Sequence, residues 1–296
     1  MYYPYFRGKQ FELITIRETA RVLADAAFVP IIEPVREALS GLERTLKAIC
    51  DIGGNAVVIV NPYHGDHSED GIGISSLLEA NFLGQDTIAA GVLLKKDMTV
   101  DEAVACYEKH KGHKMTFVHA GFSEARALAE RLGDDLKGTR NVFLEAHCGK
   151  LYRKHFQGNS RILLRDGFKR RRNADHPVLE EFSDLHATFQ EEGMDGFGDF
   201  LIVGDDYTEG GGPAYAVAIH LTFIDPDRDD AMFIYHFVSA TKDTPTDPAG
   251  KFGEALKKLI AKLDSGTSKL LKTTAVEEFR ERHSQGHFPG LGYVKK

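Results

Sequence analysis

The chain has 296 residues, 42% of them hydrophobic and 27% charged, which is typical of a globular protein with a substantial core. Its formal net charge of -7 and isoelectric point near 6.0 argue against a general nucleic-acid binder and against a protein that binds anionic membranes. The three cysteines, Cys50, Cys106 and Cys148, are far apart and form no CxxC pair, so we expect a reducing, cytoplasmic location.

The N-terminal segment, residues 1–7, has neither a basic region nor a long apolar region, so we expect no secretory signal peptide. No run of about 18 apolar residues occurs, which predicts that the chain has no membrane span.

Apolar runs of strand length alternate with amphipathic stretches of helical length, as in a mainly parallel sheet built of βα units. The clearest buried strand is Ala56–Val60, a β-branched run that is apolar on both faces. The predicted strands are Tyr2–Phe6, Val29–Ile32, Ala56–Val60, Ile88–Leu94, Met115–Val118, Asn141–Leu144, Arg161–Leu164 and Phe200–Val203. The predicted helices are Phe11–Ala26, one beginning at Ser40, Ile72–Gly84, Thr99–His110, Ser123–Leu136 and Pro177–Glu192. Ser40 with Glu43, and Thr99 with Glu102, match the capping-box pattern.

Eight such units favour a closed (β/α)8 TIM-barrel-like fold over an open doubly wound sheet. The pattern then changes, because Ala214–Phe223 and Met232–Val238 alternate like the strands of an antiparallel hairpin. We therefore expect a single α/β barrel domain, residues 1–296, with a hairpin insertion at about 214–239 before the last barrel helix, Lys251–Leu263. The C-terminal extension, about 265–296, reads as irregular.

Polar groups follow nearly every predicted strand. Because the C-terminal strand ends of a barrel meet at one mouth, these side chains are the strongest indication of function in the sequence. They are Arg7 and Lys9, Glu33, Asn61, Lys95, His119, Glu145 with His147, Arg165 with Asp166, and Asp205 with Asp206.

Each of these residues also has a purely structural interpretation. Glu33, before Pro34, caps a turn or serves as a functional carboxylate, and Asn61, before Pro62, starts a turn or orients a ligand. His119 is either a hydrogen-bonded core histidine or a catalytic one. Strand alternation would place Glu145 and His147 on one face, which suits an acid–base pair or two metal ligands.

Charged clusters outside the strands allow the same two interpretations. Arg165 and Asp166 form a local ion pair or belong to the site, and Asp205–Asp206 is an acidic turn or a cation ligand. The basic run 169–172 is a solvated loop or an anion site. His64, Asp66 and His67 offer three metal-ligand types within four residues, but no HExxH motif accompanies them. A divalent metal cofactor is therefore allowed without a specific motif, and we assign no metal ligand.

Several segments in combination resemble the bacterial and phage "beta protein" family, for which no activity is established, and a relative found in mobile or defence-like loci. They are MYYPYFRGKQFEL (1–13), VPIIEP (29–34), VNP (60–62), GFGDF (196–200), VAIHLT (217–222) and HFVS (236–239), and the resemblance extends to about Gly292. It implies a barrel-like fold and draws attention to further residues of these motifs. These are Arg7, Lys9, Gln10, Glu33, Asn61, Asp199, His220 and His236.

The first functional hypothesis is a barrel hydrolase or lyase, phosphodiesterase-like, that acts on a small anionic substrate by acid–base chemistry. Its catalytic residues would be Glu33, Glu145, His119 and Asp199. Its substrate-binding residues would be Arg7, Lys9, Asn61, Arg165, Asp166, His220 and His236.

The alternative is a non-catalytic binding subunit of a phage- or defence-related complex, with the inserted hairpin as the surface for a protein partner. Nucleic-acid binding through residues 169–172 is the least favoured hypothesis because of the negative net charge. The sequence does not set the oligomeric state.

Overall fold

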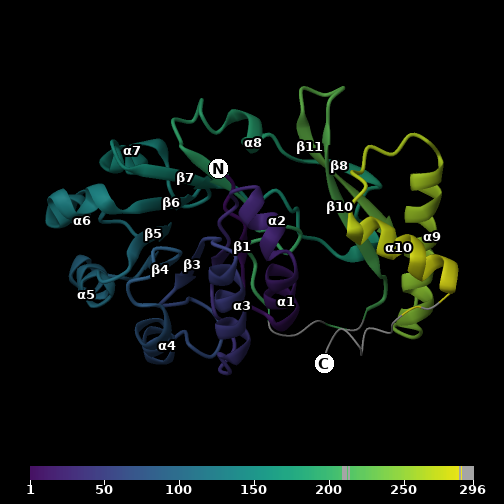
Figure 1. Cartoon of the computed structure of the whole chain (residues 1–296). Helices are drawn as coiled ribbons and strands as arrows, with labels where there is room; N and C mark the ends of the chain where they lie inside the picture. Colours follow the sequence, from purple (N-terminus) through teal and green to yellow (C-terminus); the bar gives the residue numbers. More distant parts are fainter. Residues whose placement is uncertain (209–211, 213, 287, 289–296) are drawn as a thin grey trace. The chain divides into compact units, whose positions relative to one another are not determined.

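The computed structural model describes residues 1–208, 212, 214–286 and 288 (Figure 1). Contacts divide the chain into two compact units. The first comprises Met1–Asp166 and Thr188–Leu201, and the second comprises Gly167–Ala187 and Ile202–Lys296. The sequence analysis treated the whole chain as one barrel domain carrying a hairpin, whereas the structure groups the hairpin with a further strand and two helices. Within the described ranges, no helix is both long and apolar enough to cross a bilayer.

The first unit is the predicted parallel α/β barrel. Its strands pair in the order β1-β2-β3-β4-β5-β6-β7-β9, each parallel to the next. They are β1 (Tyr5–Phe6), β2 (Ile31–Ile32), β3 (Ala56–Ile59), β4 (Ile88–Lys95), β5 (Lys114–Ala120), β6 (Arg140–Leu144), β7 (Ser160–Leu164) and β9 (Gly196–Gly198). A bridge between Tyr2 and Phe197 joins the last strand to the first, and the Tyr3 backbone N–H donates to the Phe197 carbonyl at 2.8 Å.

The barrel core follows from strand alternation. Val57 and Ile59 of β3 point into a single interior cluster, which also contains Val118 of β5 and Phe200 after β9. Side chains of opposite parity are buried as well, because helices cover the outside of the strands (Figure 1). Strands that are buried on both faces explain the near-continuous apolar runs from which they were predicted.

The helices of this unit connect successive strands. They are α1 (Gln10–Glu18), α2 (Ala20–Asp25), α3 (Ser40–Asp51), α4 (Ile72–Phe82), α5 (Val100–His110), α6 (Ala125–Leu132) and α7 (Lys150–Arg153), with 3-10 turns at Gly133–Gly138 and Lys154–Phe156. The capping box of Thr99 and Glu102 is confirmed at the start of α5. The one predicted at Ser40 is wrong, because Ser40 is already helical and Leu39 occupies the N-cap position without a side-chain hydrogen bond.

The second unit is built on a three-stranded antiparallel sheet in the order β10-β11-β8. Its elements are β8 (Leu179–Ser183), β10 (Ala218–Asp225), β11 (Ala231–Val238), α9 (Pro248–Asp264) and α10 (Thr274–Gln285). Phe223, Phe233 and Tyr235 pack with Leu256 and Leu259 of α9 in one apolar cluster. The predicted hairpin is therefore present, but α9 covers this sheet and is not the last helix of the barrel. Helix α10 lies in the extension that the sequence analysis took as irregular.

Two predicted elements are wrong. The segment predicted as the helix Pro177–Glu192 forms β8 and the short helix α8 (Leu185–Thr188), since pairing with β11 overrides the local helical pattern. The predicted strand Phe200–Val203 is a turn, and Gly196–Gly198 is the strand instead. Leu201 adopts a φ of 54°, and Ile202 and Val203 are 42% and 40% exposed, so this apolar run leaves the barrel.

Glycine in β9 permits the close approach that closes the barrel. A Cβ atom on Gly198 would lie 2.1 Å from the carbonyl oxygen of Tyr3 and 2.5 Å from Leu164 Cδ2. The first neighbour is backbone that already belongs to the closing strand pair, so it cannot rotate away. Any side chain at this position would force the two ends of the sheet apart.

We expect Gly198→Ala to lower the free energy of unfolding by about 3 kcal/mol, the upper range for overpacking a core, as measured by urea denaturation of the full chain. The matched control is Gly138→Ala, an exposed site where a Cβ atom would meet nothing within 4 Å. Similar small losses for both variants would contradict this account of barrel closure.

Candidate functional site

The C-terminal ends of the barrel strands carry a set of charged and amide side chains, which we call the barrel mouth. It comprises Arg7, Glu33, Asn61, Lys95, Glu145, Arg165, Asp166 and Asp199, each at or just after the end of a strand. Alternation from the interior positions Ile31, Ile59 and Leu93 directs Glu33, Asn61 and Lys95 inward. Alternation from the interior positions Leu144 and Leu164 directs Glu145 and Arg165 to the other side of their strands. Asp199 is next to the interior Phe200 and points the same way as these two.

A buried ion pair between Arg7 and Glu33 is the centre of this set. One Glu33 oxygen accepts from Arg7 Nη1 and from the Tyr5 hydroxyl at 2.9 Å. The other accepts from the backbone N–H groups of Tyr63 and His64 at 2.8 and 3.2 Å. These donors occupy both carboxylate oxygens, so Glu33 is suited to holding the loop after β3 and poorly suited to acting as a general base.

Aromatic rings complete the surroundings of Arg7. Its guanidinium carbon lies 5.1 Å from the centre of the Tyr5 ring and 5.5 Å from that of Phe200. The ring faces favour the cation, which lies within the barrel interior with little access to water. Arg7 is thus a structural partner of Glu33 as much as a candidate ligand for an anion.

Asn61 follows the end of β3, and Lys95 is the last residue of the neighbouring strand β4. The Asn61 amide donates to the Leu93 carbonyl at 2.9 Å and accepts from the Leu93 N–H at 2.8 Å, so it continues the β3–β4 ladder past the end of β3. That geometry supports its structural interpretation. Lys95 Nζ donates to the Pro62 carbonyl at 2.9 Å and lies 5.9 Å from the Tyr63 ring centre. Burial lowers the pKa of Lys95, although the charges of Asp97 and Glu33 act in the opposite direction.

The acidic residues of the mouth are held in two ways. Arg165 donates two hydrogen bonds to the Glu145 carboxylate, from Nε to Oε2 at 2.6 Å and from Nη2 to Oε1 at 3.0 Å. The two side chains are 27% and 32% exposed. Asp199 is buried and accepts from the Tyr2 hydroxyl at 2.8 Å and the Leu201 N–H at 2.9 Å. Burial raises the pKa of Asp199, and the charge of nearby Asp166 acts in the same direction.

His119 does not join the mouth. Its neighbours in sequence, Val118 and Ala120, face the barrel interior, so its ring points outward. Nδ1 lies 2.8 Å from the Tyr152 hydroxyl and Nε2 lies 3.2 Å from Asn141 Oδ1, and the rings of Phe143 and Phe156 enclose it. Burial lowers the pKa of His119 to about 3, so the ring is neutral at physiological pH. It is the hydrogen-bonded core histidine of the structural interpretation.

His147 and Lys9 are two further residues that the sequence analysis placed at strand ends. The chain turns directly after β6, with the His147 N–H bonded to the Leu144 carbonyl at 2.9 Å. Strand alternation therefore does not relate His147 to Glu145. Lys9 is the N-cap of α1, where its backbone N–H donates to Glu12 Oε2 at 3.0 Å.

The proposed metal-ligand types in the loop after β3 do not form a cluster. Asp66 accepts from the Glu37 N–H at 2.7 Å, and His67 Nε2 lies 3.1 Å from the Arg36 carbonyl. Among the described residues, the side chains whose possible metal-ligand atoms do cluster are a different group, His176, His220 and His236.

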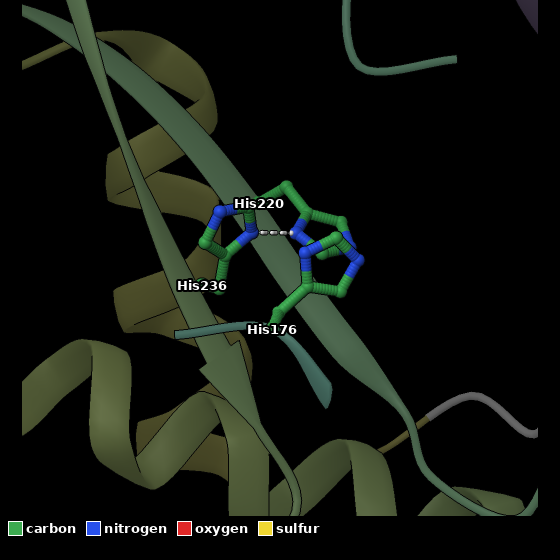
Figure 2. A group of neighbouring side chains, drawn as sticks. All are labelled: His176, His220 and His236. Atoms are coloured by element: carbon green, nitrogen blue, oxygen red, sulfur yellow. Dashed lines mark hydrogen bonds between the residues drawn. The ribbon is translucent and has the colours of Figure 1, made fainter. Parts of the chain in front are cut away.

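His176, His220 and His236 belong to the second unit, whereas the sequence analysis grouped His220 and His236 with residues of the barrel strands. His220 of β10 and His236 of β11 are directly opposite each other, on the sheet face turned away from α9. Their Nδ1 atoms are 2.6 Å apart, and the ring of His176 lies against both (Figure 2). His176 was missed because it lies in a connecting segment whose position depends on β8.

The charged runs of the second unit are largely neutralised locally. Arg171 and Lys169 lie 2.9 and 3.7 Å from Glu180, and Arg170 lies 3.2 Å from Asp206. Arg172 pairs with Asp175 at 2.7 Å. This pattern supports the structural interpretation of the basic run over an anion site.

We expect Glu33→Gln to lower the free energy of unfolding by about 3 kcal/mol, because it leaves the buried Arg7 guanidinium without its counter-charge. Urea denaturation measures this loss. Glu145→Gln is the matched control, since its ion pair with Arg165 is partly exposed and should cost less than about 1 kcal/mol. Equal effects would show that Glu33 is not the structural centre of the mouth.

His119 should make the stability of the protein depend on pH. Its folded pKa of about 3 lies below the ordinary value of 6.5, so between these values the unfolded chain binds a proton that the folded chain does not. Its contribution to stability is therefore complete above pH 6.5 and declines as the pH falls toward 3. We expect His119→Leu to reduce the slope of unfolding free energy against pH by on the order of 1 kcal/mol per pH unit in this window, measured by urea denaturation. The exposed His155, changed to Gln, is the control, and an unchanged slope in His119→Leu would refute the assignment.

Comparison with known proteins adds no relative to these observations. We found no protein-family model, curated protein or solved structure that matches the chain. The resemblance to the "beta protein" family stays a prediction, and the interpretation of the site depends on its geometry alone.

Proposed function

We propose that the barrel is an enzyme, a hydrolase or lyase, that binds a small anionic substrate at its mouth, and that Lys95 is the cation that binds it. The observation that carries the proposal is the environment of the Lys95 ammonium. Lys95 is the last residue of β4, and its side chain points into the barrel. Among the described residues, the only hydrogen bond of its ammonium group is to the neutral carbonyl of Pro62. Two of its three N–H groups are therefore available to a ligand.

The other basic residues of the mouth support this choice by contrast. Arg7 is engaged by Glu33, and Arg165 is engaged by Glu145. No carboxylate lies within 4 Å of the Lys95 ammonium in the described part of the chain. An anion that entered the mouth would supply the missing counter-charge without displacing an ion pair that already exists.

Burial also makes Lys95 chemically suitable. A lysine whose pKa is lowered by burial is a better base or nucleophile than an exposed one, and it still binds phosphate or carboxylate when protonated. Burial also raises the pKa of Asp199, but its carboxylate lies beside the inward-facing Phe200 and accepts from Tyr2, so we assign it no role next to Lys95. In this assignment Glu33 positions the loop after β3, and His119 supports the fold.

The alternative of a non-catalytic binding subunit has less support. The apolar alternation of the hairpin suggested a surface for a partner, but Phe223, Phe233 and Tyr235 are already covered by α9. No contact in the described residues favours a phage or defence complex over any other setting.

We expect Lys95→Met to weaken anion binding at least tenfold, which corresponds to the loss of one charge-assisted hydrogen bond of about 1.5 kcal/mol or more. The probes are inorganic phosphate, pyrophosphate and a panel of small phosphorylated and carboxylated compounds. Thermal shift selects binders, and isothermal calorimetry measures their affinity.

Lys96→Met is the control, because Lys96 is the adjacent lysine and is exposed. The proposal fails if no anion in the panel stabilises the wild-type protein, or if Lys95→Met binds as tightly as Lys96→Met.

A further inference from the structure

We propose that His176, His220 and His236 form a binding site for one divalent transition-metal ion, with zinc as the best match. The site lies within the second unit and does not depend on Lys95 or on the barrel mouth.

The spacing of the three rings fits a shared ion. Each ring offers one nitrogen, and these atoms all lie within 4.8 Å of one another. Zinc binds histidine nitrogen at about 2.0–2.1 Å in a tetrahedral arrangement, which places two ligand nitrogens roughly 3.3 Å apart. The 2.6 Å separation between His220 and His236 Nδ1 is shorter than this value and the 4.8 Å limit is longer. Side-chain adjustments on the order of 1 Å would bring all three to the required spacing.

The arrangement is unusual for histidines without an ion. The ring centres of the three pairs are 4.4, 4.8 and 4.9 Å apart. Two facing Nδ1 atoms form a hydrogen bond only when one ring carries the proton there and the other does not. In addition, Nδ1 of His176 is buried and makes no hydrogen bond among the described residues, since Glu180 Oε1 lies 3.9 Å from it, beyond hydrogen-bond distance. A metal ion would accept the lone pairs of all three rings at once.

Glu180 supplies the outer contact that a metal-binding histidine usually has. His236 Nε2 lies 3.0 Å from Glu180 Oε1, which favours the tautomer with a proton on Nε2 and a lone pair on the inward Nδ1. Arg171 donates to the other Glu180 oxygen at 2.9 Å. Burial raises the pKa of Glu180, but the hydrogen bond and charge of Arg171 outweigh this and hold it below its ordinary value, so the carboxylate stays ionised.

An aromatic ring borders the three histidines on one side. Phe168 packs edge-on against His220, with ring centres 5.2 Å apart, and forms an apolar wall. His220 is only partly buried, so solvent can reach the site from its side.

The ligand set defines the metal class. Three imidazoles suit zinc, cobalt, nickel or copper, whereas magnesium and calcium require oxygen ligands. Three protein ligands leave a fourth tetrahedral position for water or another small ligand. An ion would also tie the segment before β8 to the hairpin, since the ligands come from both.

The test is metal binding by the full chain, prepared with a chelator and without a polyhistidine tag. Competition with a chromophoric chelator measures zinc affinity, elemental analysis measures stoichiometry, and cobalt(II) is the spectroscopic probe. We expect one equivalent of zinc, a raised melting temperature, and the intense visible absorption of four-coordinate cobalt(II). His220→Gln and His236→Gln should each lose the cobalt spectrum and weaken zinc binding by at least tenfold, with folding checked by circular dichroism.

Two further variants make the result specific. Glu180→Gln should keep the stoichiometry of one and weaken affinity by about 10- to 100-fold, as expected for a residue that orients a ligand. The double variant His64→Gln/His67→Gln, in the loop after β3, should bind like the wild type. The proposal is overturned if the wild type binds no zinc after chelator treatment, or if binding is lost in the loop variant and retained in His220→Gln.

Discussion

Closure of the barrel through the backbone of β9 is the constraint on which the first unit depends. β1 has two residues and β9 has three, so little strand length is available to hold the sheet ends together. Closure instead uses backbone hydrogen bonds from Tyr3 to Phe197 and from Tyr5 to Asp199. These bonds need the close approach that Gly196 and Gly198 allow. The same contacts fix β1 against the sheet and so hold Arg7 beside Glu33 at the C-terminal end of the barrel.

Charged residues that meet at one end of a barrel are not all available for chemistry, as the barrel mouth shows. Charged groups of both signs meet there, but most of them satisfy one another. The Arg7–Glu33 ion pair is buried, so removing either partner would leave the other charge unpaired inside the protein. The pair is therefore needed for the stability of the fold. Glu145 and Arg165 satisfy each other at the rim. We therefore propose Lys95 as the group that binds the anion, in place of Arg7, because Glu33 already engages Arg7.

The second unit follows a different principle. Antiparallel pairing places His220 and His236 opposite each other, and the segment before β8 brings His176 to them. One face of the hairpin packs on α9, while the other carries the histidines and faces Glu180. The three imidazole rings, of which His236 contacts Glu180, offer three nitrogen ligands within 4.8 Å of one another. The two candidate sites thus have separate structural origins and call for different ligands, an anion and a metal cation.

The sequence alone determined the parallel α/β barrel and all of its strands except the last, because strands buried on both faces leave continuous apolar runs. It left His119 open, because β5 is apolar on both faces and only the structure shows that Val118 and Ala120 are the residues facing the interior. Local pattern failed where pairing between distant segments decides the conformation. β8 is a strand because β11 lies beside it, and Gly196–Gly198 forms the last strand because a glycine backbone fits against β1 where the apolar run after it does not. Only the tertiary structure joined His176 to His220 and His236, because no spacing along a chain encodes a contact made across a sheet.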